Sequence, residues 1–282
     1  MSIRSKSTTE SLAHLTSLLR EHKKVYFSRY GDGEIYTMVG KDCLEHDVSD
    51  SLEKGLIHSF EIYSPQYLKA IGVNYPIEPG MIHGLFAPYI DNFDLEKYLL
   101  NRFPKEDGAV YENQILFHYL SVFKPDVMTK FLNEFVRGKR IMFVGSTPRE
   151  VVEKLYGPLE VYIQIPNKNA FYKMDEWFPE ILNNAHKVDV ILPSAGVASN
   201  IINAKLWDAG VEAHVLDLGS LVDAAEGKGS RKWIKLKGYK VNQILLPQYQ
   251  NHTLSFALKN FFKDVWFELR KAWKGNKYKL PY

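Results

Sequence analysis

The sequence predicts an α/β fold, in which a Rossmann-like and mostly parallel sheet carries helices on both faces, together with a helical insertion. Two observations predict it. From residue 139 onward, short apolar segments with strand character alternate strictly with amphipathic helical segments. In the first half, a further strand-like run begins at Val25 and ends in a glycine-containing turn. We expect strands from both halves to share one sheet with right-handed crossovers.

Composition limits the classes of protein to which the chain belongs. Its 282 residues are 45% hydrophobic and 24% charged, as in ordinary globular proteins, and the net charge of +3 gives no reason to expect a nucleic-acid partner. The single cysteine, Cys43, excludes an intramolecular disulfide. No apolar run approaches the ~20 residues that span a bilayer, and the first residues lack the apolar core of a signal peptide. We therefore expect a cytoplasmic protein.

The first half is expected to form a helix, two strands and several further helices, assigned from apolar periodicity and from glycine and proline breaks. The predicted strands are the run from Val25 and residues 67–73. The predicted helices are residues 9–22, 35–39, 51–63, 94–103 and 111–136, of which the last two would form an insertion or cap over about 90–137.

The second half gives the regular alternation. The predicted strands are residues 140–144, 161–165, 188–192 and 211–217, with a further possible strand at 241–246. The predicted helices are residues 147–156, 174–185 and 197–209, with a long amphipathic helix over about 254–274. Residues 226–231 read as a glycine- and lysine-rich loop. No linker separates two domains, so we expect one domain over 1–282.

The stretch from Val25 to Glu34 carries the strongest chemical signal. A strand runs into a turn with glycines at 31 and 33, and the turn presents Asp32 and Glu34, with Arg29 just upstream. Asp-x-Glu offers hard oxygen ligands to Mg²⁺ or Mn²⁺, and arginine suits phosphate. The alternative is an acidic surface turn in which the arginine makes a local ion pair.

Three later strand ends carry candidate substrate-binding residues. Ser146, Thr147 and Arg149 follow one strand, where Thr147 and Glu150 predict a capping box with Pro148 at the first helical position, and free helix amides suit an anion. Lys168 and Asn169 follow the next strand and would contact a base or a diphosphate. Gly196 precedes a helix start and allows close backbone approach. The alternatives are plain helix capping, an asparagine-rich turn and an ordinary glycine turn. His118 is expected to be a core or surface histidine, since no second ligand accompanies it.

The segment Arg29-Tyr-Gly-Asp-Gly-Glu34 resembles the Arg-aromatic-Gly-Asp-Gly-Glu signature of the GT-D type glycosyltransferases. Residues 140–219 are similar to that family in their Asn-Ala-Phe, their glycine turn and an Asp-aliphatic-Gly ending at Gly219. The resemblance implies that Asp32 and Glu34 bind the metal and the nucleotide sugar, with a UDP-sugar favoured as donor, and that Gly31 and Ser220 lie at the substrate.

Two departures from the family concern the end of the last strand. The family commonly has a histidine where this chain has Ser220, so His214 or Asp223 is a candidate replacement. Of the family's downstream acidic pair, only the second acid remains, at Glu226. For the general base that deprotonates the acceptor, the candidates are Glu226, Asp223 and Asp217, and the resemblance favours the first.

The leading hypothesis is a metal-dependent glycosyltransferase that transfers a sugar from a nucleotide-diphosphate donor to a hydroxyl of a glycan, glycoprotein or lipid-linked acceptor. The alternative is a non-catalytic Rossmann-type domain that binds a nucleotide or another phosphorylated ligand. A nicotinamide or methyl-transfer enzyme is disfavoured, because no Gly-x-Gly-x-x-Gly follows a strand. The basic, tryptophan-containing helix near the C-terminus would either dock on the protein core, which we favour, or contact an anionic membrane.

Overall fold

A computed structural model gives the fold of the chain. It describes residues 2–22, 24–41, 47–76, 78–79, 85 and 92–251, together with positions 258, 262, 265, 266 and 269. Within the described residues no helix is long and apolar enough to cross a membrane.

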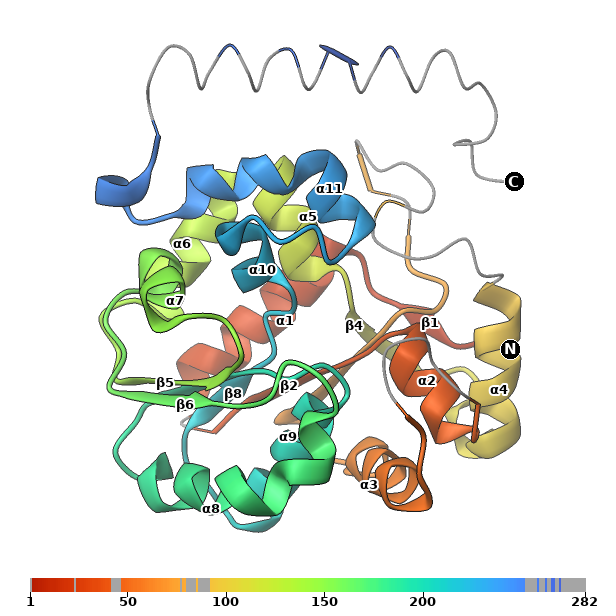
Figure 1. Cartoon of the computed structure of the whole chain (residues 1–282). Helices are drawn as coiled ribbons and strands as arrows, with labels where there is room; N and C mark the ends of the chain where they lie inside the picture. Colours follow the sequence, from red (N-terminus) through yellow and green to blue (C-terminus); the bar gives the residue numbers. More distant parts are fainter. Residues whose placement is uncertain are drawn as a thin grey trace.

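The described chain forms one eight-stranded sheet that takes strands from both halves of the sequence (Figure 1). The strand order is β1-β4-β3-β2-β8-β7-β5-β6, and every described pairing is parallel. The strands are β1 (Arg4–Ser5), β2 (Tyr26–Tyr30), β3 (Tyr67–Ile71), β4 (Val110–Asn113), β5 (Ile141–Gly145), β6 (Val161–Gln164), β7 (Val190–Ser194) and β8 (His214–Leu216). The predicted α/β fold with a parallel sheet is confirmed.

Strand β2 joins the two halves of the sheet. It pairs along its whole length with β3, from Tyr26 opposite Tyr67 to Tyr30 opposite Ile71, and on its other side with β8. A parallel strand in this position is buried on both faces and needs a near-continuous apolar sequence, and Tyr26, Phe27 and Tyr30 are fully buried. The turn that follows β2 therefore lies near the middle of the carboxyl edge of the sheet.

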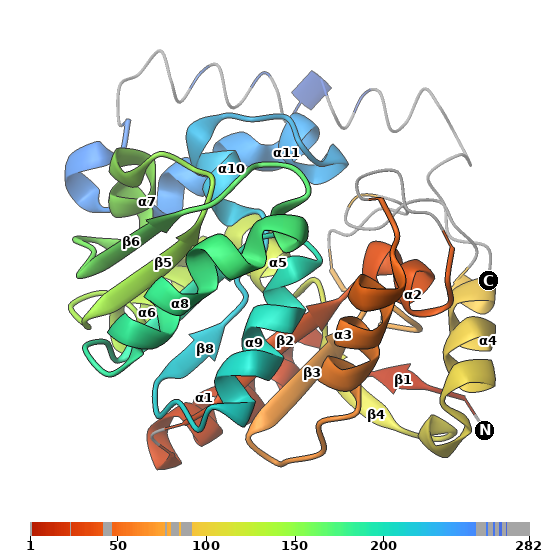
Figure 2. The same cartoon turned by 60° about the horizontal axis from the view of Figure 1, so that its bottom comes forward.

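Helices cover both faces of the sheet and bury two separate apolar cores (Figures 1 and 2). One face carries α2 (Asp32–Met38), α3 (Asp50–Phe60), α8 (Met174–Ala185) and α9 (Ala198–Asp208), while α4 (Asn92–Arg102) packs into the same core at the β1 edge. The other face carries α1 (Thr8–Glu21), α5 (Leu116–Phe123), α6 (Pro125–Phe135), α7 (Arg149–Tyr156), α10 (Leu221–Glu226) and α11 (Lys232–Lys237). The molecule is thus a three-layer arrangement of helices, sheet and helices.

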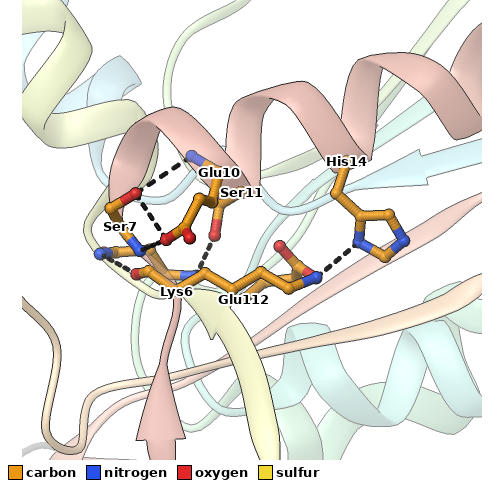
Figure 3. Close-up of polar contacts among 7 residues, drawn as sticks. Lys6, Ser7, Glu10, Ser11, His14 and Glu112 are labelled. Atoms are coloured by element: carbon orange, nitrogen blue, oxygen red, sulfur yellow. Dashed lines mark hydrogen bonds and ion pairs between the residues drawn. The ribbon is translucent and has the colours of Figure 1, made fainter.

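Polar contacts attach the N-terminal segment to β4, the strand next to the edge strand β1 (Figure 3). Ser7 caps α1 by accepting from the Glu10 backbone, and the Glu10 carboxylate accepts from the Ser7 backbone in return, a capping box that satisfies two free amides. The buried carboxylate of Glu112 accepts from Lys6 Nζ at 2.6 Å and lies 2.8 Å from His14 Nδ1. These contacts hold the first helix against the sheet edge.

Two predicted elements are wrong. The helix predicted over 111–136 begins only at Leu116, because Val110–Asn113 is the strand β4, so the region predicted as a helical insertion also contributes a strand to the sheet. The possible strand at 241–246 lies within a 3-10 helix, Gly238–Ile244, where Val241 and Ile244 pack into the core. Both errors concern short apolar runs, whose length and composition fit either type of element.

The predicted C-terminal helix falls largely outside the described residues. Its five described positions are helical, and their side chains are exposed: Leu258, Phe262, Val265, Trp266 and Leu269. Its docking on the core or on a membrane stays a prediction.

Candidate active site

The acid turn after β2 is the start of a helix. Gly31 is the N-cap and α2 begins at Asp32, so Asp32 and Glu34 lie in its first turn, where the predicted helix began only at Ile35. The Glu34 carboxylate accepts from the Gly31 N–H through Oε2 at 2.8 Å and thereby caps its own helix. Acids are favoured at a helix N-terminus by the free amides and the helix dipole. The Glu34 carboxylate is therefore part of the N-terminal cap of its own helix.

Negative charge accumulates around this turn. Burial raises the pKa of Glu34 to about 7, and the neighbouring carboxylates of Asp32 and Asp217 add to the rise, although backbone hydrogen bonds oppose it. Burial also raises the pKa of Asp217, against the opposing effect of Arg29. Carboxyl groups with raised pKa at a strand edge are candidates for a functional site, because the fold holds them there at a cost in free energy.

Arg29 lies beneath the turn and connects three strand ends. Its Nε donates to the Gln114 carbonyl at 2.9 Å, and its Nη1 lies 3.6 Å from Asp217 Oδ1. The side chain is only 11% exposed. Arg29 is the last residue but one of β2, Gln114 follows β4 and Asp217 follows β8, so this arginine connects the three strand ends.

The strand end at Gly219 brings His118 to the site. Gly219 has a φ of +69°, and a Cβ built there would lie 2.0 Å from Arg29 Nη1 and 2.5 Å from His118 Nε2, so only glycine fits. The Ser220 N–H donates to His118 Nε2 at 3.3 Å. Burial lowers the pKa of His118, aided by the charge of Arg29, which keeps the ring a neutral acceptor.

His118 is buried, which is one of the two positions, core or surface, that were predicted for it, and it makes a contact that the sequence did not indicate. Its ring stacks on Trp233, with centroids 4.9 Å apart. The imidazole contacts Ser220, the position at which the resembled family has a histidine. The replacement roles considered for His214 and Asp223 stay predictions. A separation of 102 residues left no local signal for this contact.

Helix α9 supplies two further polar residues that sequence reasoning missed. Asn200 donates to the Arg29 carbonyl at 2.9 Å, and Asn203 donates to Ser28 Oγ at 2.6 Å. Both residues are almost completely buried, and their Oδ1 atoms have no hydrogen-bond partner within the described residues. Gly196 precedes α9, and the ligand contact predicted for it stays a prediction.

The two loops after β5 and β6 make local contacts. The predicted capping box is wrong, because α7 begins at Arg149 with Pro148 before it and Thr147 makes no side-chain cap. The Arg149 guanidinium donates to Glu153 at 2.8 Å and to the Leu159 carbonyl at 2.7 Å. Arg149 is therefore already occupied by protein acceptors.

The other predicted residues of these loops pair with one another or with the chain before α3. Ser146 Oγ donates to Asn167 Oδ1 at 3.0 Å, and Asn169 Nδ2 donates to Asp47 Oδ2 at the same distance. Lys168 is exposed. The substrate-binding roles predicted for this region stay predictions.

The acids of α10 lie at its first and last turns and have partners of their own. Asp223 accepts from Ser230 Oγ at 2.6 Å. Glu226, the last residue of the helix, forms an ion pair with Lys228 at 2.9 Å. Among the described residues, no group of three or more His, Cys, Asp or Glu side chains is arranged to hold a metal ion.

Comparison with known proteins finds solved structures with a similar fold. No protein-family model and no curated protein sequence matches the chain. Two solved structures of the domain of unknown function 1792, one described as having a distinct glycosyltransferase fold, are 22% identical to this chain with TM-scores of 0.59 and 0.58, over 80% of each chain. A structure described as a new glycosyltransferase of this kind from Streptococcus sanguinis is 19% identical with a TM-score of 0.57, over 79% of this chain and 83% of that one. The chain shares this fold.

Proposed function

We propose that this protein is a metal-dependent glycosyltransferase that uses a nucleotide-diphosphate sugar. The observation that carries the proposal is the meeting of Asp32, Glu34, Asp217 and Arg29 at the carboxyl ends of β2 and β8. Ligands of α/β sheets bind at this edge. Similar solved structures are described as glycosyltransferases, which supports the same class of reaction here.

Asp32 and Glu34 fit a Mn²⁺ or Mg²⁺ ion. Such ions are usually held by one or two protein carboxylates, with the remaining positions taken by water and substrate phosphates. A Glu34 pKa of about 7 means that this group is partly protonated at neutral pH, so a cation would displace its proton and relieve the repulsion from Asp32. When bound, the ion supplies a Lewis acid that offsets the charge on the departing diphosphate.

The remaining residues have distinct proposed roles. Arg29 holds the ends of β2, β4 and β8 in place and adds positive charge below the diphosphate. Asp217 accepts the proton of the acceptor hydroxyl, because its charge acts on Glu34 at the acid turn, whereas Glu226 is not among the charges that act there. Burial raises the Asp217 pKa, which strengthens it as a base. The acceptor remains a glycan, a glycoprotein or a lipid-linked sugar.

Thermal stabilisation by nucleotide sugars tests this function. The purified protein is heated with UDP, UDP-glucose, UDP-galactose and their guanine and adenine counterparts, in Mn²⁺ and in EDTA. A ligand at 100 times its Kd adds roughly 2.7 kcal/mol to the free energy of unfolding. We expect a UDP-sugar to stabilise the protein only with Mn²⁺, and Asp32→Asn to abolish that shift. Stabilisation of equal size in EDTA would favour a metal-independent binding domain.

A further inference from the structure

Gln114 lies at the edge of the candidate site and has no part in the chemistry described so far. It follows β4 by one residue, and its backbone carbonyl accepts from Arg29 Nε at 2.9 Å. The backbone contact fixes where the side chain starts, beside the turn after β2. Gln114 is therefore positioned by the same arginine that connects the strand ends of the site.

Gly31 makes room for the Gln114 side chain, and Gly72 lies at ordinary contact distance from it. A Cβ built on Gly31 would lie 2.9 Å from Gln114 Nε2 and 3.2 Å from Glu34 Oε2, and one built on Gly72 would lie 3.7 Å from Gln114 Oε1. Gly31 has φ −88° and ψ −166°, a conformation open to any residue. Glycine at position 31 is thus explained by space and not by backbone geometry. The amide and the Glu34 carboxylate meet over this glycine.

The Gln114 amide is accessible to a ligand. In the part of the chain that the structure describes, its side chain makes no hydrogen bond. The residue is half-buried, and its amide atoms are not buried away from solvent. Because an amide carries two donors and one acceptor oxygen, its position beside Glu34 suits a ligand with polar groups.

Tyr75 adds an aromatic ring to the same side of the acid turn. It follows β3 and is half-buried, and burial together with the Asp32 charge raises its pKa to about 12. Tyr75 and Gln114 thus lie on the β3 and β4 side of the acids, whereas Arg29 Nη1 points to Asp217 on the β8 side. A neutral amide and a phenol suit hydroxyl groups, which both donate and accept, while phosphate oxygens only accept and favour arginine.

We propose that Gln114 binds hydroxyl groups of the transferred hexose and so determines which donor sugar is accepted. The inference rests on the proposed function, since it takes the acids of α2 as the diphosphate and metal side of the same site. The nucleotide diphosphate then contacts Asp32 and Glu34, and the hexose extends toward the ends of β3 and β4. Gln114 would contribute to hexose affinity and little to nucleotide affinity.

Gln114→Met tests the proposal, because methionine keeps the length of the side chain and removes its hydrogen bonds. The Kd values of UDP, UDP-glucose and UDP-galactose are measured with Mn²⁺, along with donor hydrolysis without an acceptor. We expect the Kd of UDP to change less than twofold and kcat/KM for the preferred UDP-hexose to fall about tenfold, as for the loss of one or two hydrogen bonds. Gln66→Met is the matched control, at the amino end of β3.

A second variant tests the packing that places the amide. Gly31→Ala adds a methyl group 2.9 Å from Gln114 Nε2. We expect this variant, like Gln114→Met, to lower kcat/KM for the preferred UDP-hexose and so to reduce discrimination between UDP-glucose and UDP-galactose. Gly72→Ala is its control, because that methyl group meets Gln114 only at ordinary contact distance. Melting temperatures are measured for all variants, so that a loss of folding is separated from a loss of hexose binding.

The outcomes separate this proposal from the proposed function. Equal losses of affinity for UDP and for UDP-hexoses in Gln114→Met would assign the residue to the nucleotide or to Arg29 and overturn hexose recognition. An unchanged kcat/KM, or a loss that appears only with an acceptor present, would also overturn it. If the unmodified protein binds neither UDP nor any UDP-hexose in Mn²⁺, the proposed function fails, and the role of Gln114 fails with it.

Discussion

The carboxyl ends of β2 and β8 differ from those of β5 and β6 in how their polar groups are satisfied. Arg29, in β2, bonds residues distant in the sequence: Gln114, 85 residues away, and Asn200, 171 residues away. Arg149, after β5, bonds Glu153 and Leu159, four and ten residues away, although Asn169 after β6 reaches Asp47, 122 residues away. Both groups of strand ends carry the residue types from which the sequence predicted phosphate binding.

This difference shows why residue type alone did not identify the site. Local partners occupy Arg149 after β5, whereas Lys168 after β6 is exposed. At β2 and β8 the fold instead brings carboxylates together, leaves the Gln114 amide without a described partner and raises the pKa of Glu34 to about 7. A site is indicated where tertiary contacts maintain charges that are unfavourable in the absence of a ligand.

The largest expected effect comes from the proposed base. Asp217→Asn removes a proton acceptor while nearly preserving shape, and we expect turnover to fall by about 10²–10⁴-fold with donor affinity retained. Glu226→Gln is the matched carboxyl-to-amide change at α10 and should keep turnover within about threefold, since Glu226 is paired with Lys228. Steady-state transfer assays measure the turnover of both variants. A large loss in Glu226→Gln alone would move the base to α10, as the family resemblance suggests.

The next largest expected effect concerns the acids in the first turns of α2 and α7. Asp32→Asn and Glu34→Gln should each lower turnover by about 10²–10³-fold, because they remove charge that holds a cation at the diphosphate. Glu150→Gln makes the same change in the first turn of α7, where the residue is exposed, and should leave turnover unchanged. Kinetics at several Mn²⁺ concentrations test the comparison. Equal activity of all three variants would remove the distinction between the two edges.

Gly219 and Gly210, two glycines with positive φ, extend the comparison to the free energy of unfolding. Gly219→Ala places a methyl group against Arg29 and His118 at a φ of +69°, and should lower the free energy of unfolding by about 3 kcal/mol. Gly210→Ala has a φ of +70° with no atom within 4 Å and should cost only about 1 kcal/mol. Chemical denaturation measures both. Equal losses would mean that the backbone conformation, and not the crowding at the site, requires glycine at 219.

The smallest expected effect is a pH dependence of the free energy of unfolding caused by Lys69, a buried lysine away from the strand ends. Burial lowers its pKa to about 8, although Glu106 and Glu61 oppose the shift, and three aromatic rings face the ammonium. Between pH 8 and 10.5 the unfolded chain therefore binds more protons than the folded one, so stability rises with pH in that window. The rise should be about 1–2 kcal/mol between pH 8 and 9.5.

The control for this pH effect is Lys69→Met, in which the rise between pH 8 and 9.5 should disappear whatever the absolute stability of the variant. Denaturation curves at four pH values measure the slope for both proteins. The same slope in both would mean that the aromatic rings keep Lys69 charged in the folded state and offset its burial.

The sequence by itself determined the class of fold and the position of the acid turn. Strict alternation after residue 139 requires parallel strands with helical crossovers, and the apolar run before Arg29 is long enough for a buried strand. It also located Asp32, Glu34 and Asp217, because each lies at a strand end that an apolar run predicts. It misread residues 110–113, since a short apolar segment beside helical periodicity fits either element.

Only the tertiary structure decided which polar residues meet. His118 reaches Ser220, Asn200 reaches Arg29, and Gln114 lies against Gly31, through contacts between elements far apart in the chain. Sequence patterns report local periodicity and caps, whereas these contacts depend on the order of strands in the sheet and on which helices cover each face. The same order left Arg149 to its local partners and collected the buried charges at β2 and β8.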